Sequence, residues 1–342
     1  MSMKAQIAID MMGGDHGLPV TLAAAARFIN ERPHVTVLLV GDEVLLRSQL
    51  ATYHLIEGER VVIVHAPEVV AMGESPAVAL RTKKKSSMRV AIDCVRDGSA
   101  QAAVSAGNTG ALMATAKFVL KMLPGIDRPA ICTALPNRKG HTHVLDLGAN
   151  VECNADHLFQ FAVMGSVLVE AYDDNPSPRV GLLNVGAEAI KGNDTVKAAA
   201  ALLAAGPINY IGYVEGDDIY KGDVDVVVCD GFVGNVALKA SEGLAKMITQ
   251  FLREEFSRGL LSKLAAVIAM PVLKRLKKRL DPGRYNGASF LGLQGIVIKS
   301  HGGADVAAFM SALNVALREI EKDVPRRIDL RLGQLLNEKE LA

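Results

Sequence analysis

Strand-like and helix-like segments alternate along most of this chain of 342 residues. An apolar run at 5–10 precedes a segment with helical periodicity near 19–31, and a second pair follows at 34–42 and 43–51. Similar pairs continue to about residue 231. Repeated strand–helix units form mostly parallel sheets, because each right-handed crossover lays a helix on one face of the sheet. The alternation therefore predicts an α/β protein with a doubly wound sheet in an α/β/α sandwich.

One pair of segments breaks the alternation. The apolar runs 129–136 and 141–149 follow each other with no helical segment between them, which predicts a hairpin. We therefore expect a mixed sheet with some antiparallel pairing. Because no linker rich in Pro, Ser or Gly interrupts the chain, we expect residues 1–342 to form one catalytic domain.

Composition narrows the classes of partner and compartment. Half of the residues are hydrophobic and only 4% are aromatic, as suits helices packed on a parallel sheet. The formal net charge is +1, so no overall field favours nucleic acid. The cysteines are widely spaced, which favours neither disulfides nor a zinc site. They are Cys94, Cys132, Cys153 and Cys229.

We expect a cytoplasmic protein. The N-terminal segment enters a strand almost at once, leaving no room for a signal peptide. No apolar run approaches the roughly 18 residues of a spanning helix.

Five strand candidates end in turns that combine glycine with polar residues. These are DMMGGD at 10–15, SAGNTG at 105–110, DLGAN at 146–150, NVGAEAIKGND at 184–194 and CDGFVGN at 229–235. Carboxyl ends of parallel strands meet at one edge of a sheet, and glycine turns with helix N-termini bind anions. We therefore expect one shared polar site. Neither GxGxxG in the first turn nor GxxxxGK[ST] is present, which argues against NAD(P) and ATP but not against phosphate.

Particular side chains in these turns have chemistry suited to an anion. Lys191 lies between a strand and a helix expected to begin near 193, where its charge could hold phosphate. Asn235 could donate to a developing oxyanion or cap the helix that starts near it. Asp10 and Asp230 could orient donors or act as caps.

The histidines are less informative. His141 and His143 would share one face of a strand, as metal ligands can, but no carboxylate or third histidine is near in sequence. We predict no metal. His16 and His301 lie in glycine turns and are better candidates for a general acid. No GxSxG elbow indicates a serine hydrolase.

Two clusters are basic and contain no acid: RTKKKSSMR at 81–89 and the segment 257–280. In the second, helical spacing aligns an apolar stripe beside basic residues, next to the apolar run LAAVIAM. A basic amphipathic helix suits an anionic membrane, an acidic partner or a dimer contact, although burial of LAAVIAM in the core is an alternative. We expect 253–284 to protrude as a helical segment. Its expected membrane contacts are Val272, Leu273, Leu276, Lys277, Lys278 and Leu280.

These motifs in this order closely resemble the bacterial phosphate acyltransferases of the PlsX type. The resemblance runs from DMMGGDHGLP through ESPAVALRTKKKSSM, SAGNTGALM, DLGANVECNADHLFQFAVMG, LLNVGAEAIKGND and YVEGDDIYKGDVDVVVCDGFVGNVALK to YNGASFLGLQGIVIKSHG. It covers roughly residues 5–310. Two departures are Met11, where the family often has alanine, and Ala187, where a polar residue is common.

The resemblance implies an activity and partners. The family forms acyl-phosphate from acyl-acyl-carrier-protein and inorganic phosphate, and a membrane glycerol-3-phosphate acyltransferase of the PlsY type uses the product for phospholipid synthesis. It implies a homodimer peripherally associated with the inner face of the cell membrane, no metal or nucleotide cofactor, and kinship with phosphotransacetylase and isocitrate-dehydrogenase folds.

The resemblance also implies roles for the turn residues. Lys191 would bind phosphate, Asn235 would stabilise the oxyanion, and the helix start at Asn108, Thr109 and Gly110 would complete the anion cradle. Asp10 and Asp15 would orient the turn, because carboxylates repel phosphate. Other residues expected to line the phosphate and thioester site are Gly13, Gly14, Asp146, Asn150, Asp230, Gly231 and His301. Residues that either dock the acidic carrier protein or line the phosphate site are Arg81, Lys83 and Lys84.

Two other functions are compatible with parts of the sequence. A metal- and NAD-dependent dehydrogenase of the isocitrate-dehydrogenase class would share the fold but needs an acid cluster and a nucleotide site. A non-catalytic membrane scaffold would draw support only from 257–280.

Overall fold

Eleven strands form one sheet in the part of the chain that the computed structural model describes, residues 5–280 and 282–341. The side chains of 277–280, 282 and 336–341 lie outside the description. The strand order is β3-β2-β1-β4-β11-β10-β5-β6-β9-β7-β8. The strands are β1 Ala5–Asp10, β2 Val35–Gly41, β3 Val61–His65, β4 Ala102–Ser105, β5 Ala130–Pro136, β6 His141–Leu145, β7 Val180–Leu183, β8 Tyr210–Val214, β9 Val226–Val228, β10 Ala288–Leu291 and β11 Ile296–Lys299.

The two halves of the sheet run in opposite directions. Strands β3, β2, β1, β4 and β11 are parallel to one another, and so are β6, β9, β7 and β8. Between them β10 is antiparallel to β11 and β5, and β5 is antiparallel to β6. The predicted hairpin and mixed sheet are confirmed. The prediction that all five glycine turns share one edge is wrong, because three antiparallel steps reverse the strands between the turns of β1 and β4 and those of β6, β7 and β9.

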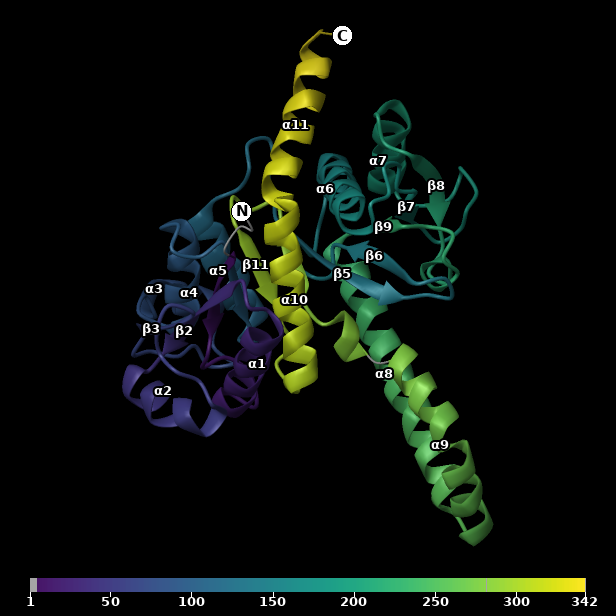
Figure 1. Cartoon of the computed structure of the whole chain (residues 1–342). Coiled ribbons are helices and arrows are strands. Elements are labelled where there is room, and N and C mark those ends of the chain that lie inside the picture. Colours follow the sequence, from purple (N-terminus) through teal and green to yellow (C-terminus); the bar gives the residue numbers. More distant parts are fainter. Residues whose placement is uncertain (1–4, 281, 342) are drawn as a thin grey trace.

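Helices cover both faces of this sheet, as the α/β/α prediction requires (Figure 1). Along β1, Ile7 and Ile9 pack in the core formed with α1 and α10, whereas Ala8 packs with α4 and α5 on the opposite face. Helices α6, α7 and α11 cover the other half. The helices are α1 Leu18–Glu31, α2 Glu43–Leu50, α3 Pro76–Thr82, α4 Ser87–Arg96, α5 Thr109–Leu120, α6 Ala155–Asp173, α7 Asp194–Ala205, α8 Gly231–Ser257, α9 Leu260–Leu280, α10 Val306–Lys322 and α11 Val324–Leu341.

Helices α8 and α9 extend away from the sheet as a helical hairpin (Figure 1). In α8 only Gly231 and Gly234 are buried. In α9 the apolar run LAAVIAM is not core, since Val267 and Ile268 are 67% and 74% exposed. Val272 and Leu276 are also exposed, and Leu273 is half-buried. The side chains of Lys277, Lys278 and Leu280 lie outside the described residues.

Two expectations about covalent and membrane structure can be checked directly. All four cysteines are free, so no disulfide forms. Among the described residues, no helix combines the length and apolarity needed to cross a bilayer.

Candidate functional site

The turns after β1, β4 and β11 meet and form what we call the first turn cluster, residues 10–15, 105–110 and 299–303. Backbone hydrogen bonds join them: the Asp15 N–H donates to the Gly302 carbonyl at 2.8 Å, and the Ser300 N–H donates to the Ser105 carbonyl at 2.8 Å. The approach is close enough to require glycine, because a Cβ at position 13 would lie 2.8 Å from the Gly107 nitrogen. The pair of glycines in DMMGGD is therefore set by this junction.

Asp10 is buried at the base of the first turn cluster. The Ser105 hydroxyl donates to its Oδ2 at 2.6 Å, and the Met12 N–H donates to its Oδ1 at 3.2 Å. Burial raises the pKa of this carboxyl, and the hydrogen bonds from its neighbours oppose that rise. The geometry fits the predicted role of orienting the turn. Asp15 is exposed and lies against Gly302.

Lys299 is a member of the first turn cluster that the sequence reasoning missed. It is only 8% exposed, and its ammonium donates to the Ala106 carbonyl at 3.2 Å and to the Ser300 carbonyl. Burial lowers its pKa to about 8, while the carboxylates of Asp10 and Asp15 favour the charged form. A lysine that ends an apolar run directly before a glycine turn, as in IVIKSHGG, was the available signal.

The start of α5 contacts the segment that leads through α3 into the basic cluster at 81–89. Asn108 caps the helix by accepting from the Ala111 N–H at 2.9 Å, and its amide donates to the Met72 and Glu74 carbonyls at 2.6 and 3.1 Å. Gly110 lies against Pro76, the first residue of α3. Thr109 follows the cap as the first residue of α5.

The three basic residues that were singled out lie at the other end of α3. Arg81 and Lys84 are exposed and Lys83 is half-buried. Of the carboxylates that the structure describes, none forms an ion pair with these three cations. They are therefore available to an anionic ligand or an acidic partner.

The turns after β6, β7 and β9 form a second turn cluster, residues 146–150, 184–194 and 229–235. Asp146 is fully buried and accepts backbone N–H bonds from Gly148, Ala149 and Asn150 at 3.2, 3.0 and 2.7 Å. The Asn150 side chain donates to the same carboxylate at 2.9 Å. A Cβ at Gly231 would lie 2.6 Å from the Asn150 carbonyl, which explains the glycine there. The buried Asp146 carboxylate therefore holds the backbone of this turn in place.

The structure separates the alternatives for Asn235 and Asp230. Asp230 caps α8 by accepting from the Val233 N–H at 2.9 Å, so the cap interpretation of Asn235 is wrong. Asn235 instead lies one turn into α8, exposed and packed over Gly148. Lys191 is exposed in the loop after β7. Asn193, two residues further on, caps α7, and the helix thus begins near 193 as expected.

The two turn clusters lie at opposite edges of the sheet, but helix α8 lies near both of them. It begins in the second cluster, and Lys239, one turn beyond Asn235, contributes to the electrostatic surroundings of Lys299 and His301 in the first. Burial lowers the pKa of His301; Glu242 opposes this effect, and Lys239 and Lys246 add to it. Both clusters therefore lie beside the first turns of α8. His16 is exposed in the first cluster's loop.

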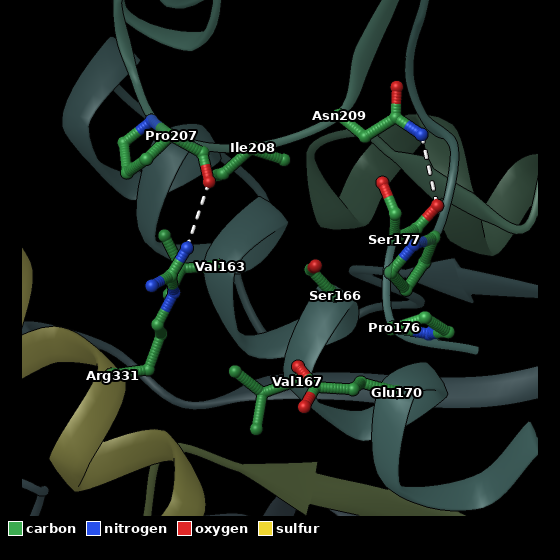
Figure 2. A pocket seen from close by; sticks show the side chains of 11 residues that line it. Val163, Ser166, Val167, Glu170, Pro176, Ser177, Pro207, Ile208, Asn209 and Arg331 are labelled. Atoms are coloured by element: carbon green, nitrogen blue, oxygen red, sulfur yellow. Dashed lines mark hydrogen bonds between the residues drawn. The ribbon is translucent and has the colours of Figure 1, made fainter. Parts of the chain in front are cut away.

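Two surface hollows differ in size and place. The one in Figure 2 lies between α6, two loops and Arg331 of α11, holds about 80 Å³, and includes none of the predicted site residues. A wider one of about 500 Å³ is lined mainly by Met12, Val44, Leu45 and Val69. Met12 precedes Gly13, so this hollow adjoins the first turn cluster. Only the second hollow has a volume typical of ligand sites.

A family model described as fatty acid synthesis protein matches residues 5–327. A phosphate acyltransferase from Methylococcus capsulatus is 59% identical over 98% of this chain and 99% of its own length, and one from Alkalilimnicola ehrlichii is 58% identical over 99% of both. The chain belongs to the phosphate acyltransferase family. The resemblance carried by the motifs is thereby confirmed.

Solved structures show how widely this phosphate acyltransferase fold is shared. A phosphotransacetylase from Streptococcus pyogenes superimposes with a TM-score of 0.64 at 17% identity, covering 94% of this chain and 95% of its own. A 4-hydroxythreonine-4-phosphate dehydrogenase from Klebsiella pneumoniae gives 0.54 at 14%, covering 92% and 98%. The predicted kinship with phosphotransacetylases is confirmed at the level of fold. The dehydrogenase alternative is not favoured, because the relatives of high identity are phosphate acyltransferases.

Proposed function

We propose that this phosphate acyltransferase converts acyl-acyl-carrier-protein and inorganic phosphate into acyl-phosphate and free carrier protein, at a site between the two turn clusters. The observation that carries the proposal is the course of α8, which has Asn235 at one cluster and Lys239 near the other. Glycine turns, helix N-termini and lysines lie around the first turns of α8, and all of these groups can bind a dianionic substrate.

The reaction requires positioning more than an activated side chain. A phosphate oxygen attacks the thioester carbonyl carbon, the C–S bond breaks, and the sulfur leaves as a thiolate that takes up a proton from solvent. A thiol with a pKa of about 8.5 needs little acid assistance in leaving. What the protein must supply is alignment of phosphate and stabilisation of the tetrahedral oxyanion.

We assign these tasks to exposed groups. Lys191, beside the α7 N-terminus, holds phosphate, and the Asn235 amide donates to the oxyanion. The α5 N-terminus at Thr109 and Gly110 completes the anion cradle. Asp10 and Asp146 act indirectly, since their carboxylates already accept hydrogen bonds from the turns that they shape.

The ammonium of Lys299 has a positioning role in this proposal. It is hydrogen-bonded to carbonyls of two different turns, so it holds the first turn cluster together. Its positive charge also lies among the carboxylates of Asp10 and Asp15. The net negative charge that a phosphate dianion would meet there is thereby reduced.

The larger substrate groups have candidate surfaces next to the site. The hollow lined by Met12, Leu45 and Val69 takes the acyl chain, since its walls are mainly apolar and it opens beside Gly13. The unpaired cations Arg81, Lys83 and Lys84 dock the acidic carrier protein.

We assign the α8–α9 hairpin to contacts outside the catalytic centre. The hairpin exposes many apolar side chains; Phe251, Leu264 and Ile268, for example, are 56%, 59% and 74% exposed. An exposed apolar surface of this kind is typical of a site that binds a membrane or another protein. Near basic Lys274 and Arg275 it suits an anionic membrane, and the remaining apolar area suits a second copy in a homodimer. Such a peripheral enzyme at the inner face of the membrane would pass acyl-phosphate to a membrane glycerol-3-phosphate acyltransferase. Residues 1–342 act as one catalytic domain in this scheme.

The test is incubation of purified protein with acyl-acyl-carrier-protein, with and without phosphate, and detection of acyl-phosphate as its hydroxamate. We expect product only with phosphate, and loss of product in Lys191→Ala. Lys197→Ala is the matched control, because Lys197 is an exposed lysine on α7 outside the glycine turns. Thioester loss at the same rate without phosphate, or equal turnover in Lys191→Ala, would overturn the assignment.

A further inference from the structure

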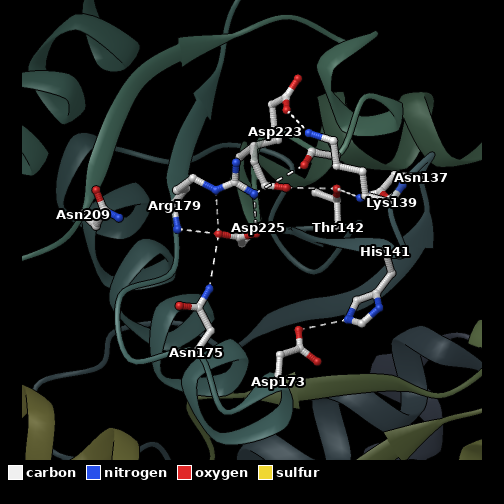
Figure 3. A network of polar contacts seen from close by, with 12 residues as sticks. Asn137, Lys139, His141, Thr142, Asp173, Asn175, Arg179, Asn209, Asp223 and Asp225 are labelled. Atoms are coloured by element: carbon white, nitrogen blue, oxygen red, sulfur yellow. Dashed lines mark hydrogen bonds and ion pairs between the residues drawn. The ribbon is translucent and has the colours of Figure 1, made fainter.

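Two histidines and one carboxylate meet at the beginning of β6. His141 and His143 occupy alternate positions and so share one face of the strand, with ring centroids 4.9 Å apart. Asp173, the last residue of α6, lies beside them, and its Oδ2 is 3.0 Å from His141 Nε2 (Figure 3). One nitrogen or oxygen from each residue lies within 4.8 Å of those from the other two.

His143 carries a second, independent sign of a missing partner. The side chain is 3% exposed, and its buried Nδ1 has no hydrogen-bond partner among the side chains and backbone that the structure describes. It is the one such atom in that part of the chain. Buried polar atoms are nearly always paired, and a bond from Nδ1 of His143 to a metal would remove the deficit.

Contrary to the prediction of no metal from the sequence, we propose that His141, His143 and Asp173 form a divalent transition-metal site, best matched to Zn²⁺. Two imidazoles and one carboxylate are ligands that zinc accepts, and tetrahedral bonds of about 2.1 Å place ligand atoms about 3.4 Å apart. The His141–Asp173 pair at 3.0 Å is already near that spacing. The separations from His143 are at most 4.8 Å, so they would shorten by at most about 1.4 Å on metal binding. The side chains of His141 and Asp173 are 30% and 32% exposed, which leaves a coordination position for water.

The charges around the site predict moderate affinity. The Arg318 guanidinium lies over the Tyr172 ring at 5.2 Å. Its positive charge also acts on His143, so it weakens the binding of a metal cation there. The negative charge of Asp225 favours a bound cation, but this carboxylate is already paired with Arg179 at 2.8 Å. The Asp173 carboxylate is thus the main negative charge available to the metal.

The place of the site separates it from the proposed chemistry. His141 begins β6, and the second turn cluster starts at Asp146, five residues further along the strand. That distance is about 16 Å from His141 and about 10 Å from His143, at roughly 3.3 Å per residue. A metal here would join β6 to the end of α6 without touching phosphate or thioester. Its removal should therefore leave formation of acyl-phosphate intact.

The test uses the full chain without a histidine tag, dialysed against a chelator and titrated with Zn²⁺ in competition with a chromophoric chelator. We expect one Zn²⁺ per chain, and in Asp173→Asn an affinity lower by at least about tenfold, because the amide keeps the shape but removes the charge. Asp174→Asn is the control, since this adjacent exposed carboxylate pairs with Lys322 at 2.8 Å and lies outside the cluster. Affinity there should not change.

Several outcomes decide against the site. Absence of Zn²⁺ binding by the unmodified chain, or equal binding in Asp173→Asn and the unmodified chain, overturns it. If circular dichroism shows that Asp173→Asn does not fold, the same zinc titration is done with His141→Gln, which changes a half-exposed side chain. Substitution with Co²⁺ gives a further readout, because intense visible absorption lost in the variant would report direct coordination.

Discussion

Replacing Lys299 with methionine should change how the stability of this protein depends on pH. Methionine keeps the length of the apolar stem and removes the ammonium, whose pKa burial lowers from 10.5 to about 8. Between these two values the unfolded chain binds more protons at this position than the folded chain does. The free energy of unfolding therefore rises with pH across that window, and the group makes no further contribution below the lower value or above the upper one.

The magnitude follows from the difference between the two pKa values. A pKa lower by about 2.5 corresponds to about 3 kcal/mol, at roughly 1.4 kcal/mol for each factor of ten. The side chain is 8% exposed, so solvent screens little of this effect. We expect the unmodified protein to gain about 3 kcal/mol more than Lys299→Met when the pH is raised from about 7.5 to about 10.5.

The assay is urea unfolding at several pH values, followed by far-ultraviolet circular dichroism. Comparing the two proteins at each pH cancels the other lysines and the tyrosines, which titrate in both. Lys197→Met serves as the control, because it makes the same substitution at an exposed position on α7. If the difference between the unmodified protein and Lys299→Met stays constant across this window, the ammonium is not buried as the structure places it.

Further predictions concern the proposed roles. Lys191→Ala should lower kcat/KM on the order of 100-fold in the hydroxamate assay with an unchanged melting temperature; normal turnover would reject phosphate binding by Lys191. Asn235→Ala should lower kcat with little change in KM for phosphate, because an oxyanion donor acts in the transition state, and a raised KM alone would contradict this. Leu276→Glu should abolish flotation with anionic vesicles and spare turnover with soluble substrate, whereas unchanged flotation with lost dimerisation would identify a subunit contact. Leu45→Trp should shift the preference to shorter acyl chains, and an unchanged preference would remove the hollow as the acyl groove.

Much of the fold and part of the site could be predicted from local sequence. The strand at 5–10 and the helix near 19–31 appear as Ala5–Asp10 and Leu18–Glu31, because apolar periodicity and turn residues act over a few neighbouring positions. The same local rules identified the hairpin and the helix starts near 108 and 193. Asn235 was ambiguous because spacing alone does not say where a helix begins, and Asp230 proved to be its cap.

Tertiary structure decided what lies next to what. Strands β10 and β11 come from residues 288–299, yet they insert between β4 and β5 in the middle of the sheet and contribute to the reversal of its direction. Pairing of strands so distant in sequence depends on burial of both faces, which no local pattern records. The same long-range packing buries Lys299 among carbonyls and brings Asp173 to His141 and His143. Residue types and turns are thus local properties of this sequence, whereas the charge environment of each site arises only when distant segments exclude water together.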